Sequence, residues 1–267
     1  MKYNALVGWK FKIQWSDGDI ENFYIVEEST TNVDLYKIQC ISKFAQELNQ
    51  AELHKEHSYK VDDIEYKFTI LEIVNENVEK IIQNRNLTKI YHFTPIENIT
   101  NILRYGLLSR LQLSNNDIKH IINDEQRFDN HSDCISCSLE HPNFKLLYKN
   151  RVNLNRKYCL IEIDISILKN QYSVCSKTNA AKNAGRDIMP IFYLEKLFEE
   201  PRPKSLPQYY PTDEQAELLI KGPIPLNYIK SIIFDDLSLY KQYKDLPIDN
   251  IKFEYKPILF TSRGDYE

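Results

Sequence analysis

Glycine is scarce in this sequence. Only 6 of the 267 residues are glycine, and neither the glycine-rich fingerprint of dinucleotide-binding folds nor a P-loop is present. No Ser-His-Asp order that would support nucleophilic catalysis stands out either. These absences disfavour a doubly wound nucleotide-binding fold, a P-loop nucleotidase and a serine hydrolase.

Long hydrophobic runs are also missing. Residues 1–8 contain no apolar run of signal-peptide length, and no later stretch approaches a membrane span. The 5 cysteines are an odd and scattered set, which disfavours a disulfide framework and fits a reducing compartment. We therefore expect a cytoplasmic protein with no membrane partner.

Neither sign of charge is in large excess. The net charge is -4 and the isoelectric point is near 5.9, which excludes a protein whose whole surface attracts polyanions. Any nucleic-acid site must therefore be a local patch. Aromatic residues, in contrast, are plentiful: 18 tyrosines and 12 phenylalanines are available for cores and for stacking on bases.

Residues 1–75 carry the pattern of a small β-rich domain. Alternating apolar residues predict strands at 11–15, 22–26 and 66–70, and one short helix is expected at 41–48. The order of these elements resembles the C-terminal domain of the GreA/GreB transcription-factor family. An unrelated small β-domain fits the same pattern.

The stretch 76–88 is polar and is predicted to be a linker with one or two helical turns. His54 and His57 lie in another polar stretch and are expected to face solvent, so the first domain offers no catalytic constellation. The predicted division is a β-rich domain at 1–75, the linker, and a second domain at 89–267.

The second domain opens with a short apolar strand that contains His92. Thr94 can cap a helix, Pro95 suits its first position and Glu97 completes a capping box, so a helix is predicted to follow directly and to end at Gly106. A lone strand histidine is commonly a core residue. The step from a strand to a helix is also a place where ligands bind, so both interpretations stay open.

Four residues of metal-ligand type crowd together at His131, Cys134, Cys137 and His141. Structural zinc sites usually join two ligand pairs across a longer loop, and in a strand Cys134 and Cys137 would point to opposite faces. We therefore favour small buried cysteines and expect no metal.

Basic and aromatic side chains interleave at 144–151 and again at 155–158. A phosphate backbone with unstacked bases requires this combination, and a solvated amphipathic helix shows it too. Residues 158–165 predict a core strand. Strands with interspersed helices, and without regular βα alternation, indicate an α+β fold.

The stretch 211–220 ends at a stop signal, 221–223, which leaves about six residues for regular structure, a usual strand length. In a strand, Gln215 and Glu217 face one side and the intervening apolar residues face the other. The alternative is a helical capping box formed by Thr212 and Gln215.

Several short motifs of the second domain share their order and spacing with a known family. They are Tyr91-His92-Phe93-Thr94, Asn98, Gly106-Leu107, Gln126-Arg127-Phe128-Asp129, Ser136 to Ser138, Pro142-Asn143-Phe144-Lys145, Asn179-Ala180-Ala181, and Pro211-Thr212-Asp213 with Gln215-Ala216-Glu217. This set resembles the DarT family of ADP-ribosyltransferase toxins. Phe144 stands where that pattern has tyrosine, and the N-terminal domain is not part of the usual pattern.

The resemblance implies an ADP-ribosyltransferase-like split mixed sheet with helices, and a toxin that attaches ADP-ribose from NAD to a base of single-stranded nucleic acid, DNA rather than RNA. NAD is then consumed as a substrate, and no metal is needed. The resemblance also implies a toxin–antitoxin system with a macrodomain antitoxin from a neighbouring gene, in the setting of phage defence. An RNA-directed enzyme, an NAD glycohydrolase on the same fold and a non-catalytic nucleic-acid-binding module remain alternatives.

Cleavage of NAD develops positive charge on the ribose, which a carboxylate stabilises, and Glu217 is the candidate. Gln215 can donate and accept hydrogen bonds and so can orient the acceptor base. Arg127 is expected to assist catalysis chiefly by binding, because a guanidinium stays protonated. The resemblance further implies an NAD pocket of Tyr91, His92, Phe93, Thr100, Leu108, Arg127 and Phe144, and a DNA path along Lys145 and Arg151.

Overall fold

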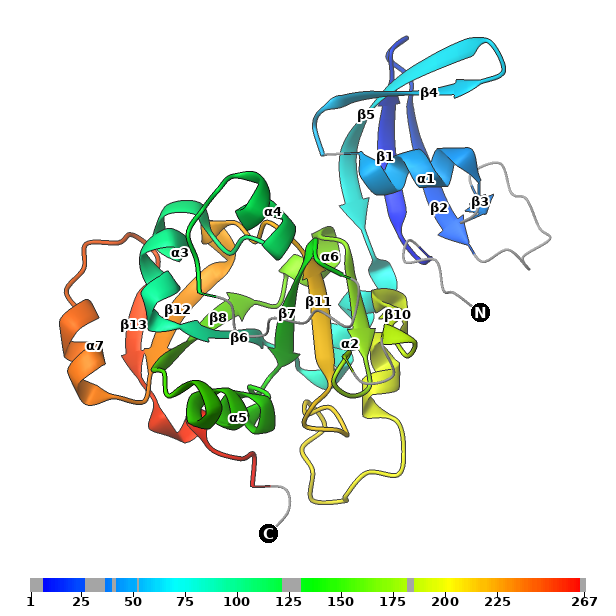
Figure 1. The fold of residues 1–267 in the computed structure, drawn as a ribbon. Helices are drawn as coiled ribbons and strands as arrows, with labels where there is room; N and C mark the ends of the chain where they lie inside the picture. The colour runs from blue at the N-terminus through cyan, green and yellow to red at the C-terminus, as the bar shows by residue number, and fades with distance from the viewer. Residues whose placement is uncertain are drawn as a thin grey trace.

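The computed structural model describes residues 7–26, 37–39, 42–51, 53–121, 131–181 and 185–264. Within these residues the chain forms two β-sheets with interspersed helices, which confirms the predicted α+β class. The smaller, N-terminal sheet projects from one side of the unit built on the larger sheet (Figure 1).

The smaller sheet has the strand order β3-β2-β1-β5-β4. Its strands are β1 (Lys10–Trp15), β2 (Ile20–Val26), β3 (Lys37–Gln39), β4 (Glu56–Val61) and β5 (Ile64–Val74). Alternation in β1 buries Phe11 and Ile13. Helix α1 (Lys43–Gln50) is capped by the Ser42 side chain and packs the ring of Phe44 on that of Trp15, with the ring centres 5.6 Å apart.

Helix α2 (Glu76–Arg85) occupies most of the predicted linker and is longer than one or two turns. Asn75 caps it, with Oδ1 accepting a hydrogen bond from the Val78 amide at 3.2 Å. The apolar Val78, Ile81 and Ile82 have i, i+3, i+4 spacing and are buried, which explains a full amphipathic helix in a polar stretch. Helix α2 packs on the 3₁₀ segment η3 (Ile191–Phe198).

The larger sheet has the strand order β10-β9-β11-β7-β6-β8-β12-β13. All neighbouring pairs are antiparallel except β12 and β13, so the sheet is mixed, as predicted. Its strands are β6 (Lys89–Pro95), β7 (Cys134–Leu139), β8 (Tyr158–Asp164), β9 (Ser173–Ser176), β10 (Met189–Pro190), β11 (Glu217–Lys221), β12 (Ile229–Phe234) and β13 (Lys252–Tyr255).

The helices and remaining 3₁₀ turns connect these strands. They are η1 (Ile96–Asn98), α3 (Ile99–Tyr105), α4 (Arg110–Asn115), α5 (Phe144–Leu154), α6 (Ile167–Asn170), η4 (Leu226–Tyr228), α7 (Leu237–Tyr243) and η5 (Pro257–Phe260). In Figure 1, α3 and α4 lie on one side of β6 and α5 lies on the other.

The larger sheet splits between β6 and β7. These strands pair only through Ile90 with Leu139 and Tyr91 with Ser138. Past Tyr91, β6 stays paired with β8, whereas the N-terminal part of β7 pairs with β11. The split-sheet prediction is therefore confirmed, and the residues after Tyr91 on β6 border an opening.

The helix predicted directly after β6 begins later than expected. Pro95 ends the strand, and η1 precedes α3. The predicted capping box of Thr94 and Glu97 is wrong, because the Thr94 hydroxyl accepts a hydrogen bond from Asn98 Nδ2 at 2.9 Å instead of capping a helix. The predicted end at Gly106 is correct, with φ of +76°.

Gly106 provides a test of the close approach between α3 and η4. A Cβ at Gly106 would run into the backbone oxygen of Ile224, whereas Gly18 has a similar positive φ with open space around it. We expect Gly106→Ala to lower the free energy of unfolding by about 2–4 kcal/mol, as backbone strain and steric overlap add. The matched control Gly18→Ala should cost about 1 kcal/mol, from strain alone. Urea unfolding measures both, and equal losses would contradict the predicted overlap.

Candidate active site

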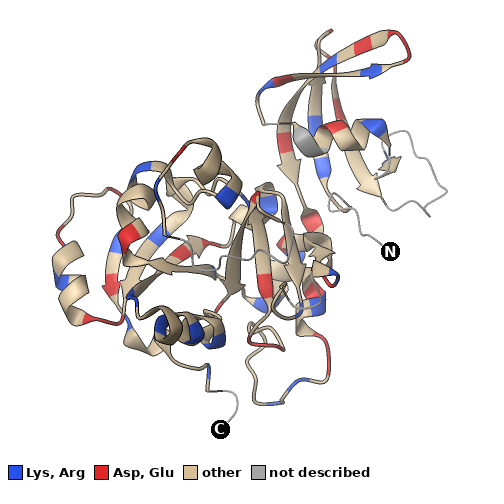
Figure 2. Cartoon of the chain, in the orientation of Figure 1, with Lys and Arg blue, Asp and Glu red and all other residues tan. Residues whose placement is uncertain are grey.

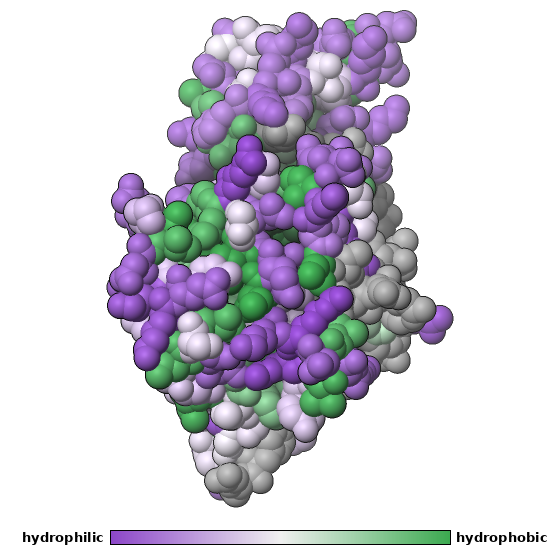
Figure 3. All heavy atoms as spheres, turned by 60° about the vertical axis from the view of Figure 1, so that its left-hand side comes forward, coloured by the Kyte–Doolittle hydropathy of each residue, from purple (hydrophilic) through white to green (hydrophobic). Residues whose placement is uncertain are grey.

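A cavity of about 700 Å³ opens at the split between β6 and β7. Its walls come from both strands, the start of β11, the middle of α3, the following segment 106–109, α4 and α5. Apolar residues (green) lie in a hollowed centre on the face that Figure 3 brings forward, and polar residues (purple) surround them. A volume of this size accommodates an elongated organic ligand.

One network of hydrogen bonds crosses the mouth of the split. His92 Nδ1 lies 2.8 Å from the Ser136 backbone oxygen, and the Ser136 hydroxyl donates to Glu217 Oε1. Because a carbonyl oxygen only accepts, Nδ1 of His92 must carry a proton, which fixes the tautomer of the neutral ring. The network ties β6, β7 and β11 together at the pocket.

Glu217 is nearly buried, at 8% exposure, and lines the pocket. Its second carboxylate oxygen, Oε2, accepts a hydrogen bond from the Ala180 amide at 2.7 Å. Donors on both oxygens compensate for the loss of water and hold the carboxylate in one orientation.

Strand β11 starts at Glu217, later than the prediction, and Gln215 lies in a turn. The backbone amide of Gln215 donates a hydrogen bond to Asp213 Oδ1 at 2.8 Å, which closes this turn. The alternative capping box is also wrong, because the Thr212 hydroxyl donates to the Glu199 backbone oxygen at 2.9 Å. Gln215 and Glu217 nevertheless both line the pocket.

Lys145 and Glu214 connect α5 to this turn. Lys145 Nζ lies 2.5 Å from Glu214 Oε1, and the Glu214 side chain is only 4% exposed. Lys145 and Lys149 both line the pocket from one side of α5, and Figure 2 shows the basic residues (blue) along that helix. The turn that carries Gln215 is therefore fixed by an ion pair next to the cavity.

The structure brings six of the sequence-predicted residues together. The pocket is lined by His92, Phe93, Leu108, Lys145, Gln215 and Glu217. Arg127 lies outside the described residues, so its predicted position is untested.

Four other predicted residues are not among the described lining residues. Tyr91 faces the opposite side of β6 from His92, in a cluster with Leu147 and Tyr158. Burial, and then the charge of Glu162, raise the pKa of the Tyr91 phenol far above its usual value, and its hydroxyl donates to Glu162.

Thr100 is exposed on α3, and the Phe144 ring packs against Tyr148 at 5.7 Å between ring centres. Arg151 points to the other side of α5, where its guanidinium pairs with Asp235 at 2.7 Å and lies over the ring of Phe260. None of the three is placed in the cavity wall formed by the described residues.

Sequence reasoning gave no role to Ser136, Ala180 or Asn98, although all three belong to the motifs quoted above. Asn98 is buried and pins the chain beside the cavity, donating to the Ile121 backbone oxygen and accepting from the Ile121 amide, each at 2.9 Å. For Asn98 and Ser136 the available signal was the residue type, because a buried asparagine or serine requires hydrogen-bond partners. Ala180 acts through its backbone amide, for which the residue type gives no signal.

Comparisons with known proteins were made for the whole chain. Residues 91–260 match the family model described as "ssDNA thymidine ADP-ribosyltransferase, DarT". No curated protein matches the sequence. The resemblance of the N-terminal domain to GreA/GreB stays a prediction, because the family match begins at residue 91.

Solved DarT structures are similar at low identity. The Thermus sp. 2.9 DarT in complex with ADP-ribosylated ssDNA has 15% identity and a TM-score of 0.49, with 66% of this chain and 97% of that chain covered. The same protein in complex with NAD+ has 15% identity and a TM-score of 0.44, with 65% of this chain and 98% of that chain covered. Thermosipho africanus DarTG in complex with ADP-ribose has 16% identity and a TM-score of 0.47, with 64% of this chain and 50% of that longer chain covered.

The family model covers well over half of the sequence. It also starts at the strand that carries His92 and includes the strand that carries Glu217. The chain therefore belongs to the DarT family of single-stranded DNA thymidine ADP-ribosyltransferases.

Proposed function

We propose that this protein is a toxin that transfers ADP-ribose from NAD to thymidine in single-stranded DNA and releases nicotinamide. The observation that carries the proposal is the carboxylate of Glu217, oriented by two hydrogen bonds at the wall of a cavity of about 700 Å³, in a member of the DarT family. The family favours DNA over RNA as the acceptor. The fixed carboxylate favours an enzyme over a passive nucleic-acid-binding module.

The proposed step breaks the bond between the nicotinamide nitrogen and the ribose. Nicotinamide leaves with the bonding electron pair, and positive charge develops on the sugar. Glu217 stabilises that charge electrostatically and through a hydrogen bond to a ribose hydroxyl. A nucleophilic atom of the thymine base then bonds to the ribose carbon and loses its proton to solvent or to a basic group of the site.

The acceptor base is held beside the sugar by Gln215. Its side-chain amide can donate to a base carbonyl and accept from a base N–H, which matches the edge of a thymine. Because Gln215 precedes Glu217 by two residues, one short segment supports both halves of the reaction. Lys145 and Lys149 supply positive charge on the α5 side, where the sugar-phosphate chain of DNA would approach.

The remaining roles rest on the family resemblance. Arg127 would bind NAD and assist the acceptor step. Any contribution of Tyr91, Thr100, Phe144 and Arg151 would come from outside the cavity wall formed by the described residues. No helix in the described part of the chain has the length and apolarity to cross a membrane. We place the reaction in the cytoplasm, opposed by a macrodomain antitoxin that removes the modification, in the setting of phage defence.

The decisive variant is Glu217→Gln, which keeps the size of the side chain and removes its charge. We expect the transfer rate to fall by about 10²–10³-fold or more, because the charge on the ribose loses its stabilisation. Nucleosides are analysed by mass spectrometry after incubation of the protein with NAD and DNA or RNA oligonucleotides that differ in one base.

The matched control is Glu140→Gln. Glu140 is equally buried, at 8% exposure, and accepts a hydrogen bond from the Lys89 amide at 3.0 Å, but it lies outside the cavity lining. Folded Glu140→Gln protein should retain transfer activity. Undiminished transfer by Glu217→Gln, or modification of RNA in preference to DNA, would refute the proposal.

The ion pair of Lys145 with Glu214 generates a separate prediction. Lys145→Met should lower the rate of transfer at saturating DNA by about tenfold or more, because the turn that positions Gln215 loses its support. Hydrolysis of NAD to free ADP-ribose should fall less, so the ratio of transfer to hydrolysis should drop.

Lys149→Met is the control, since Lys149 lines the same cavity, one helical turn from Lys145, and it is Lys145 that pairs with Glu214. It should raise KM for DNA in a salt-dependent manner and leave the ratio of transfer to hydrolysis unchanged. If both lysine variants merely weaken DNA binding, the positioning role assigned to Lys145 is incorrect.

A further inference from the structure

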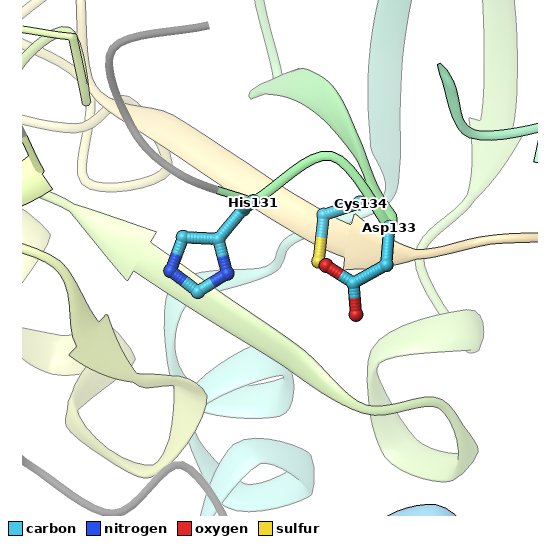
Figure 4. A group of neighbouring side chains, drawn as sticks. All are labelled: His131, Asp133 and Cys134. Atoms are coloured by element: carbon cyan, nitrogen blue, oxygen red, sulfur yellow. The ribbon is translucent and has the colours of Figure 1, made fainter. Parts of the chain in front are cut away.

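The turn that leads into β7 gathers three different metal-binding groups. The imidazole of His131, the carboxylate of Asp133 and the thiol of Cys134 each offer one ligand atom, and these atoms all lie within 4.8 Å of one another. Figure 4 shows the Cys134 sulfur between the His131 ring and the Asp133 carboxylate. His131 and Asp133 are partly exposed, whereas Cys134 is buried.

We propose that these three side chains bind one Zn²⁺ ion, with water as the fourth ligand. Nitrogen, carboxylate oxygen and thiolate sulfur together form a ligand set that zinc accepts and that magnesium and calcium do not favour. In a tetrahedral zinc site the ligand atoms are about 3.3–3.8 Å apart, given the usual bond lengths. Side-chain movements of about 1 Å would therefore close the observed group around an ion.

Backbone hydrogen bonds hold the turn in place. The Cys134 amide donates to the His131 oxygen at 3.1 Å, which folds the turn and brings both side chains together. The Leu111 amide donates to the Ser132 oxygen at 3.0 Å, and the Gly222 amide donates to the Asp133 oxygen at 2.9 Å. Because hydrogen bonds from α4 and from the end of β11 hold this turn, binding of an ion would require little further ordering of the chain.

The surroundings also favour a cation. The charge of the Asp133 carboxylate attracts a cation, and a cation beside the Cys134 sulfur favours ionisation of the thiol. Binding would release the thiol proton to solvent, because zinc coordinates the thiolate.

This group differs from the four-residue zinc set considered from the sequence. Cys137 is buried in the main core on the other face of β7, and His141 donates from Nδ1 to the Pro142 backbone oxygen at 2.9 Å. The structure therefore keeps two of the four residues, His131 and Cys134, and adds Asp133, which the sequence pattern did not single out.

Cobalt is the probe for this site, because a thiolate ligand gives Co²⁺ an intense charge-transfer absorption that oxygen and nitrogen ligands do not. Metal-free full-length protein, kept reduced without a thiol reagent, should bind one Co²⁺ with this band, and one equivalent of Zn²⁺ should abolish it. Excess Mg²⁺ should leave the band unchanged. Zn²⁺ should also raise the unfolding temperature, since it binds the folded turn.

Variants assign the ligands. Cys134→Ser should remove the charge-transfer band, and His131→Gln and Asp133→Asn should each weaken Co²⁺ binding at least tenfold. Cys137→Ser is the matched control, because it removes a buried cysteine three residues along the same strand, and it should keep the band.

The result that overturns the site is a wild-type protein with no stoichiometric band, a band that survives in Cys134→Ser, or a band lost equally in Cys137→Ser. If Cys134→Ser does not fold, as judged by circular dichroism, the partly exposed His131→Gln and Asp133→Asn decide the outcome, and unchanged affinity in both refutes the proposal. These measurements need neither NAD nor DNA, so they stand or fall separately from the proposed transferase activity.

Discussion

The active site depends on the separation of two neighbouring strands. Only two residue pairs hold β6 to β7, and beyond them each strand turns to a different partner, β8 or β11. A split in a sheet leaves peptide groups on both inner edges, and buried peptide groups need hydrogen-bond partners. The contact of His92 Nδ1 with the Ser136 oxygen supplies one such partner from a side chain. A side chain thus satisfies one peptide group at the edge of the opening without closing the gap between the strands.

The same constraint explains how a carboxylate can stay buried beside the opening. Burial of an unpaired charge would cost several kcal/mol, so each oxygen of Glu217 needs a donor. Ser136 and Ala180 provide them. Glu140 is also buried and accepts a hydrogen bond from the Lys89 amide. Burial raises the pKa of the Glu140 carboxyl group, although neighbouring hydrogen-bond donors oppose that shift. Burial and hydrogen bonding are therefore common to both carboxylates, and the position at the cavity wall distinguishes Glu217 from Glu140.

Local sequence patterns predicted most of the architecture and part of the site. The strand 158–165 follows from a short, mostly apolar run between polar loops, because such runs are buried in this fold. The capping box at Thr94 failed because a nearby buried side chain, Asn98, competes for the Thr94 hydroxyl. That competition depends on tertiary packing, which no local pattern contains.

The basic stretch on α5 is a second case in which tertiary packing, and not the local sequence pattern, decides the position of a side chain. Lys145 and Lys149 are four residues apart and share one side of the helix, whereas Arg151 follows Lys149 by two residues and lies on the opposite side. The composition of this stretch indicated positive charge near nucleic acid, but only the packing of α5 decides which side faces the cavity. Arg151 consequently pairs with Asp235 and leaves the cavity to the two lysines.

Strand β7 places two kinds of chemistry on one face. Side chains alternate along a strand, so Cys134 and Ser136 project to the same side, and Cys137 to the other. Ser136 orients the carboxylate of Glu217, while Cys134 belongs both to the cavity wall and to the metal-binding group at the start of the strand. An ion held by Cys134 would restrain the same strand edge that positions Ser136. The group proposed to bind zinc and the serine that donates to Glu217 are thus separated by two residues of backbone, the shortest spacing between side chains on one face of a strand.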